Sequence, residues 1–132
     1  MTLDDLNLHW HAVDQLNSAR DRLHSMSSFL KAQSLDGMPA GAKEQRKVEQ
    51  LSILIEQQEN EVKRMERIVR SSEPSVVAFI NSIRDNRTAQ IFSLRFLAGY
   101  EWQEVAEIIG GKNTENSVKS QCYRYLQSTN DL

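Results

Sequence analysis

Two stretches of about thirty residues without glycine or proline constrain the fold of this chain more than any other feature. The first runs from Leu3 to Ala32, and a second begins at about Lys43. The whole chain of 132 residues contains only five glycines and two prolines. Because both residues interrupt helices, their scarcity favours an all-α fold with two long helices.

Apolar residues recur along both stretches with the spacing of an amphipathic helix. In the first stretch they fall on two heptad positions, at Leu6, Val13, Leu16, Leu23 and Leu30, although Arg20 and Ser27 interrupt the pattern. In the second they alternate spacings of three and four at Val48, Leu51, Ile55, Gln58, Val62, Met65 and Val69. Gln58 is the single polar member, and such a residue often fixes register at some cost in stability.

The segment Ser34–Gly41 separates these two helices, since it contains Gly37, Pro39 and Gly41. Helices of similar length joined by a short break favour an antiparallel hairpin, which we assign to residues 1–72. A two-helix hairpin buries little apolar surface alone. We therefore expect it to pack against the C-terminal helices or against a second copy, as a homodimer.

The pattern changes at the segment Ser71-Ser72-Glu73-Pro74, where proline is expected to end the long helix and serine to cap a new one. Residues 73–132 then form a second domain of short helices. The first carries Val76 to Ile83, and the next closes at Gly99. A third runs from about Trp102 to Ile109 and ends at Gly110-Gly111. The last begins near Thr114 or Glu115.

The last two helices have the pattern of a helix-turn-helix. Small Ala106 permits a close crossing, and Val118 anchors the final helix, whose apolar face continues through Cys122 and Leu126. Polar side chains suited to DNA bases and phosphates are left for the other face and the turn. The predicted DNA-binding residues are Lys112, Asn116, Ser117, Lys119, Ser120, Tyr123 and Arg124.

Each assignment has a plainer alternative. Asn116 can read adenine or merely cap the helix, Lys119 and Arg124 can contact DNA or remain solvated, and Tyr123 can cover the core. Cys122 is interpreted as a small buried residue and not as a redox sensor.

A stretch of about 40 residues that begins at Arg87 resembles region 4 of bacterial sigma-70-type factors. The resemblance rests on Leu94-Arg95, Gly99, Glu104-Val105-Ala106, Gly110, Val118-Lys119 and Leu126, and it covers about a third of the chain. It implies a recognition helix at about 114–127 that enters the major groove. Two features depart from the sigma pattern: the turn 111–114 is about two residues longer, and Glu101 stands where a Ser or Thr cap is usual.

The whole arrangement is similar to phage and prophage late-gene regulators of the ArpU-like and RinA-like type. These proteins join a helical N-terminal part, often with a break like Gly37-Met38-Pro39, to a sigma-region-4-like end. The resemblance implies a sequence-specific transcriptional regulator of double-stranded DNA, and it is compatible with a contact to RNA polymerase.

Composition excludes several functional classes of protein. The net charge of −2 argues against a protein that coats DNA by bulk electrostatics. With one cysteine, Cys122, the chain can form no internal disulfide. No signal peptide, membrane span, phosphate loop, nucleophile motif or metal cluster is recognisable, so we expect a cytoplasmic protein that is not an enzyme and needs no cofactor or metal.

Two other functions fit the same pattern. Phage packaging or structural subunits also combine a helix-turn-helix with helical oligomerisation segments, and those would form high-order oligomers. A helical protein-interaction module without DNA binding would show no salt-sensitive affinity for DNA.

Overall fold

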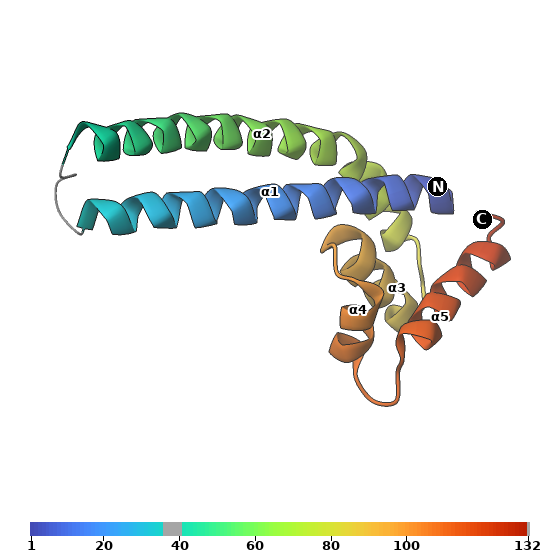
Figure 1. The fold of residues 1–132 in the computed structure, drawn as a ribbon. Coiled ribbons are helices and arrows are strands. Elements are labelled where there is room, and N and C mark those ends of the chain that lie inside the picture. Colours follow the sequence, from blue (N-terminus) through green and yellow to red (C-terminus); the bar gives the residue numbers. More distant parts are fainter. Residues whose placement is uncertain (36–40, 132) are drawn as a thin grey trace. The chain divides into compact units, whose positions relative to one another are not determined.

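The computed structural model describes residues 1–35 and 41–131, and this part of the chain is all-helical, with no strand. The predicted all-α class is therefore confirmed. Figure 1 shows the elements in chain order. They are α1 (Leu3–Leu35), α2 (Ala42–Asn81), α3 (Asn86–Phe92), the π-helical segment η1 (Ser93–Leu97), α4 (Trp102–Ile109) and α5 (Glu115–Ser128). The predicted break at 34–41 falls largely on residues 36–40, which lie outside the described residues.

The chain divides into two compact units. The helix-pair unit is Gln15–Arg67, and the globular unit combines Met1–Asp14 with Ile68–Leu132. The first turns of α1 therefore group with the short helices. Among the described residues, no helix is long and apolar enough to cross a membrane.

One prediction about α2 is wrong: this helix continues through Pro74 to Asn81, and no separate short helix begins at residue 76. Proline in a helix interior costs about 3 kcal/mol. That cost is offset because Val76 and Ile80, which follow the proline within the next two turns, are 1% and 5% exposed in the core. Burying each such side chain contributes about 1.5–3 kcal/mol.

The helix-pair unit is held by an apolar stripe from each long helix. The buried members are Leu16 and Ala19 of α1 with Ile55, Val62 and Met65 of α2. Gln58, the polar residue of the second stripe, donates its Nε2 proton to the backbone oxygen of Ala19 at 3.0 Å. This bond gives the amide a partner inside the seam and ties the two helices to one register.

The globular unit has a continuous core built from several elements. Its fully buried members are Leu6, Val76, Ile91, Phe92, Phe96, Val105, Val118, Cys122 and Leu126. Aromatic rings link the elements: Phe92 packs against Phe79 at 5.7 Å and against Tyr125 at 5.6 Å between centroids. Asp85 caps α3 by accepting from the backbone N–H of Thr88 at 3.0 Å. The core thus fixes the orientation of α4 and α5, which carry the candidate site.

Candidate nucleic-acid interface

The start of α4 is fixed by a buried arginine. The guanidinium of Arg95 lies 3.8 Å from the ring centroid of Trp10 and 4.7 Å from that of Trp102. Its Nη1 donates to the backbone oxygen of Tyr100 at 3.1 Å, and the Nε1 of Trp10 donates to the same oxygen at 3.3 Å. A desolvated cation between two indole faces contributes about 2 kcal/mol. The arginine therefore holds the residues before α4 against the first turns of α1.

Glu101 at the N-cap of α4 completes this arrangement. Its Oε2 lies 3.6 Å from Nη1 of Arg95, and its backbone N–H donates to Oε1 of Glu104 at 3.1 Å. Burial lowers the pKa of Arg95, and the carboxylate of Glu101 opposes that shift. A glutamate where a Ser or Thr cap was expected thus has a second role, as the counter-ion of a buried cation.

The turn between α4 and α5 is stabilised by backbone conformation and side-chain bonds. Gly110 and Gly111 have φ angles of 76° and 67°, which glycine adopts without the strain that a side chain would bring. The amide of Asn113 donates to the backbone oxygen of Gly110 at 2.7 Å, and its Oδ1 accepts from Nη2 of Arg87. The longer turn is therefore an ordered connection that is tied to α3.

A reciprocal capping box sets the first turn of α5. Thr114 donates its backbone N–H to Oγ of Ser117 at 2.9 Å, and Oγ1 of Thr114 accepts from the backbone N–H of Ser117 at 3.1 Å. The predicted start of this helix is confirmed. Because Thr114 is the N-cap, Asn116 is not the capping residue.

The inner face of α5 is wholly buried. Val118, Cys122 and Leu126 are each 0% exposed. Burial raises the pKa of the Cys122 thiol to about 12, so this thiol stays protonated at neutral pH. The side of the helix next to α3 is also fixed, since Nε2 of Gln121 donates to Oγ1 of Thr88 at 3.0 Å.

The opposite face of α5 is open to solvent. Asn116, Ser120 and Arg124 follow one another at intervals of four residues, and all three are exposed. Side chains at this spacing form one stripe along a helix. The structure thus brings three of the predicted DNA-binding residues together on one exposed surface, which we call the α5 stripe.

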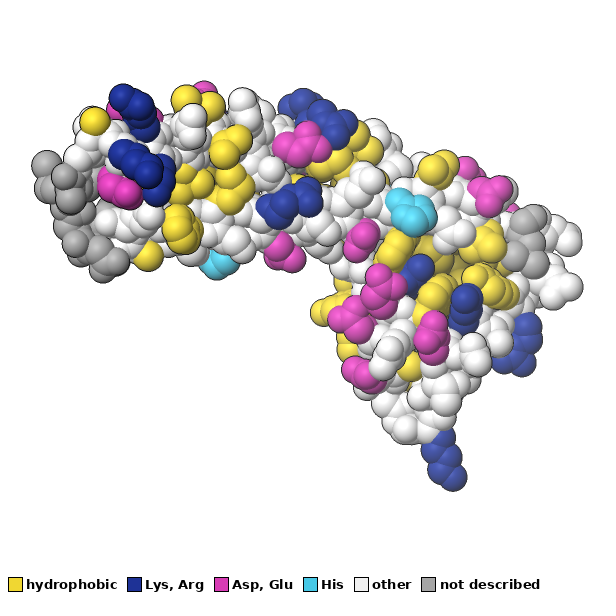
Figure 2. Space-filling model, in the orientation of Figure 1, with side chains coloured by type: hydrophobic (Ala, Val, Ile, Leu, Met, Phe, Trp, Pro, Cys, Tyr) yellow, Lys and Arg dark blue, Asp and Glu magenta, His cyan; other side chains and the backbone are white. Residues whose placement is uncertain are grey.

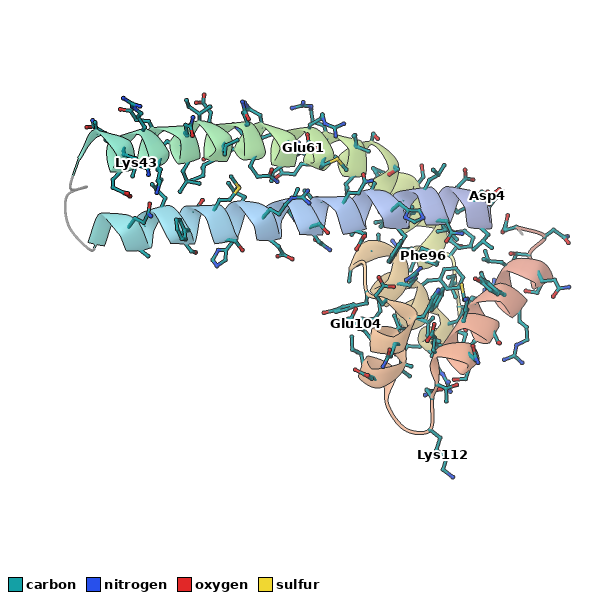
Figure 3. The ribbon with its side chains drawn as sticks, viewed as in Figure 1. Asp4, Lys43, Glu61, Phe96, Glu104 and Lys112 are labelled. Carbon is teal, nitrogen blue, oxygen red and sulfur yellow. The ribbon has the colours of Figure 1, made fainter. Side chains whose placement is uncertain are left out.

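The other four predicted residues lie around the α5 stripe in different settings. Lys112 is exposed in the turn, and Figure 3 shows its side chain pointing away from the helices. Lys119 is half-buried beside the stripe. Ser117 is half-buried, with its hydroxyl engaged in the capping box. The ring of Tyr123 packs edge-on against Trp102 at 6.4 Å.

Charge is distributed unevenly over the globular unit. Glu101, Glu104 and Glu107 are all exposed on or next to α4, and Figure 2 shows acidic side chains gathered over this part of the unit. Residues 112–127, in contrast, carry three basic side chains and one acidic one. A polyanion is therefore repelled from the exposed face of α4 and tolerated at the α5 stripe and the turn.

Sequence reasoning missed the contacts of Arg95 with Trp10, Trp102 and Tyr100, which we call the Arg95 cluster. It also missed the hydrogen bonds that join α3 to the turn and to α5. Trp10 and Tyr100 are 90 residues apart, so no local pattern signals their contact. The available signal was Arg95 itself, a cation between the apolar residues Leu94 and Phe96.

Comparison of the chain with protein-family models, with curated proteins and with solved structures finds no match.

Proposed function

We propose that this protein is a sequence-specific DNA-binding transcriptional regulator whose recognition helix is α5. The observation that carries the proposal is the division of α5 into two faces. Val118, Cys122 and Leu126 are 0% exposed, whereas the α5 stripe is exposed and offers an amide, a hydroxyl and a guanidinium. A helix held rigidly by one face and polar on the other is suited to the major groove.

Within this proposal the residues have different roles. Asn116 reads a base, because its amide can bond bidentately to adenine, and Ser120 follows it one turn later on the same face. Arg124, Lys119 and Lys112 contact phosphates and set the register of the protein on the duplex. Ser117 and Tyr123 act indirectly, since one holds the helix start and the other packs against Trp102.

The acidic residues near α4 support a readout limited to α5 and its turn. A chain with a net charge of −2 has little non-specific affinity for DNA at physiological salt. Its discrimination between sites then depends on the few base contacts of the α5 stripe.

The type of regulator and its contact with RNA polymerase are also part of the proposal. The combination of a helical N-terminal part with a sigma-region-4-like end, as in the ArpU-like and RinA-like regulators, supports a regulator of the phage or prophage type, with α4 and α5 as its helix-turn-helix. It also supports a contact with RNA polymerase near a promoter.

The experiment is a selection of binding sites from a pool of random-sequence duplexes by the full-length protein. We expect enrichment of a short motif, and we expect the variant Asn116→Ala to lose the preference at one position of it. A matched variant, Gln127→Ala, changes an exposed residue at the far end of the same helix and should keep the motif. A pool that stays random after repeated rounds, with folded protein, would favour the interaction module.

A further inference from the structure

The helix-pair unit leaves apolar side chains uncovered. Leu54 of α2 is 51% exposed and Phe29 of α1 is 58% exposed. Several seam residues near them are only half-buried, namely Leu23, Met26, Leu30, Val48 and Leu51. Two helices alone therefore do not bury the apolar surface that this unit presents.

Leu54 and Phe29 lie on one face of the pair. Each follows a seam residue by three positions, since Leu54 follows Leu51 and Phe29 follows Met26. When two helices run antiparallel, their side chains rotate about the helix axes in opposite senses along a common direction. Residues that follow the seam by the same number of positions therefore lie on the same side of the pair. Figure 2 shows hydrophobic side chains gathered along this pair of helices, with charged side chains on both sides of them.

Charges are placed symmetrically about Leu54 on α2. Lys47 precedes it by seven residues and Glu61 follows it by seven, so the three form one stripe. Each charge belongs to an ion pair within the helix. Lys47 Nζ lies 3.5 Å from Glu44 Oε1, and Arg64 Nη2 lies 2.7 Å from Glu61 Oε1.

Lys47 and Glu61 are complementary when α2 meets its own copy in the antiparallel direction. A two-fold axis through Leu54 sets residue 54 against itself and pairs positions whose numbers add to 108. Lys47 then faces Glu61 of the second copy. This pair of opposite charges occurs twice, as the symmetry of an isologous interface requires.

We propose that the face of the helix-pair unit that carries Phe29 and Leu54 binds a second copy of this chain as an antiparallel, two-fold symmetric dimer. Its apolar centre is Leu54 against Leu54, flanked by Phe29, and at each end Lys47 of one copy lies against Glu61 of the other. A regulator with two recognition helices would result, although the dimer does not depend on DNA binding.

The first test is the association state of the full chain by sedimentation equilibrium, with a pair of adjacent variants. Leu54→Asp places two charges at the axis and should weaken dimerisation at least about a hundredfold. Ile53→Asp is the control, because Ile53 is 56% exposed but lies on the far side of α2 from the seam. It should leave the dimer intact. Equal effects of both variants, or a wild type that is monomeric at high micromolar concentration, would overturn the proposal.

The second test separates this register from general apolar association. Lys47→Glu and Glu61→Lys should each weaken the dimer about tenfold, since each leaves like charges opposed at both ends. Together the two reversals restore opposite charges and should recover the wild-type affinity. Circular dichroism confirms that each variant is helical. A double variant that is weaker than either single one would refute the antiparallel register.

Discussion

The two units of this protein are stabilised to different degrees by their own residues. In the globular unit, rings such as Phe92 and Phe96 are 0% exposed, and its three shortest α-helices, α3 to α5, have capped N-termini. In the helix-pair unit, Ile55 is 8% exposed, but Phe29 and Leu54 remain more than half exposed. The comparison teaches that long helices with a good heptad pattern can still bury less per residue than short helices around a shared core.

The same substitution in each unit is the strongest test of this difference. Phe92→Ala should lower the free energy of unfolding by about 3–5 kcal/mol, because it leaves a cavity among packed rings. Phe29→Ala, at an exposed position, should cost less than about 1 kcal/mol in the monomer. Thermal or denaturant unfolding of both variants at low protein concentration measures this. Similar losses would show that the units are packed alike.

The Arg95 cluster tests whether the first turns of α1 support the globular unit. Arg95→Met keeps an unbranched side chain but removes the cation between Trp10 and Trp102 and the bond to Tyr100. We expect a loss of about 2 kcal/mol, with the fluorescence of the two tryptophans shifted. Arg20→Met, which affects an exposed ion pair with Glu66, is the control and should cost less than about 1 kcal/mol. Equal losses of stability in the two variants would show that Arg95 contributes no more than an exposed ion pair does.

Local signals in the sequence were sufficient for the elements that form the candidate site. Gly110-Gly111 ends α4 and Thr114 caps α5, and both features act within a few residues of the helix ends. The predicted bounds of α4, Trp102–Ile109, are those of the structure. The α5 stripe could be predicted as well, because its residues alternate with Val118, Cys122 and Leu126 at helical spacing.

Features that depend on tertiary packing could not be predicted. Pro74 is a local signal for a helix end, but burial of Val76 and Ile80 outweighs it. The pairing of Arg95 with Trp10 and the bond between Gln121 and Thr88 join distant segments. For Ser117 the residue was correctly placed on α5, but its hydroxyl takes part in the helix cap.

Substitutions at the N-cap of α5 and on the α5 stripe distinguish residues that stabilise the helix from residues that are available for recognition. Thr114→Ala removes the acceptor for the backbone N–H of Ser117 and should cost about 1 kcal/mol of stability. Ser120→Ala, at an exposed position of the α5 stripe, should leave stability unchanged. Denaturant unfolding gives both values. If Ser120→Ala destabilises the protein as much as Thr114→Ala, the stripe has a structural role.

The smallest expected effect concerns pH and the buried His9. This side chain is 2% exposed, and its Nδ1 lies 2.6 Å from Oγ of Ser72. Burial lowers the pKa of His9 below its ordinary value, and Glu73 opposes the shift. The neutral form is therefore favoured by folding. The contribution of neutral His9 to the stability of the fold is present above pH 6.5 and is lost as pH falls through the lower folded-state pKa.

The free energy of unfolding should accordingly fall on acidification from pH 7 to 5, and His9→Gln should reduce this slope. His11→Gln is the control, because His11 is exposed. Identical slopes in wild type and His9→Gln would contradict the assignment.

Affinity titration against a selected duplex and a scrambled duplex at several salt concentrations tests the central claim most directly. We predict that Lys119→Ala and Arg124→Ala weaken binding to both duplexes and lower the salt slope by about one each. Asn116→Ala should cost about 1–3 kcal/mol on the selected duplex and spare the scrambled one. If all three folded variants bind both duplexes as the wild type does, α5 is not the recognition helix.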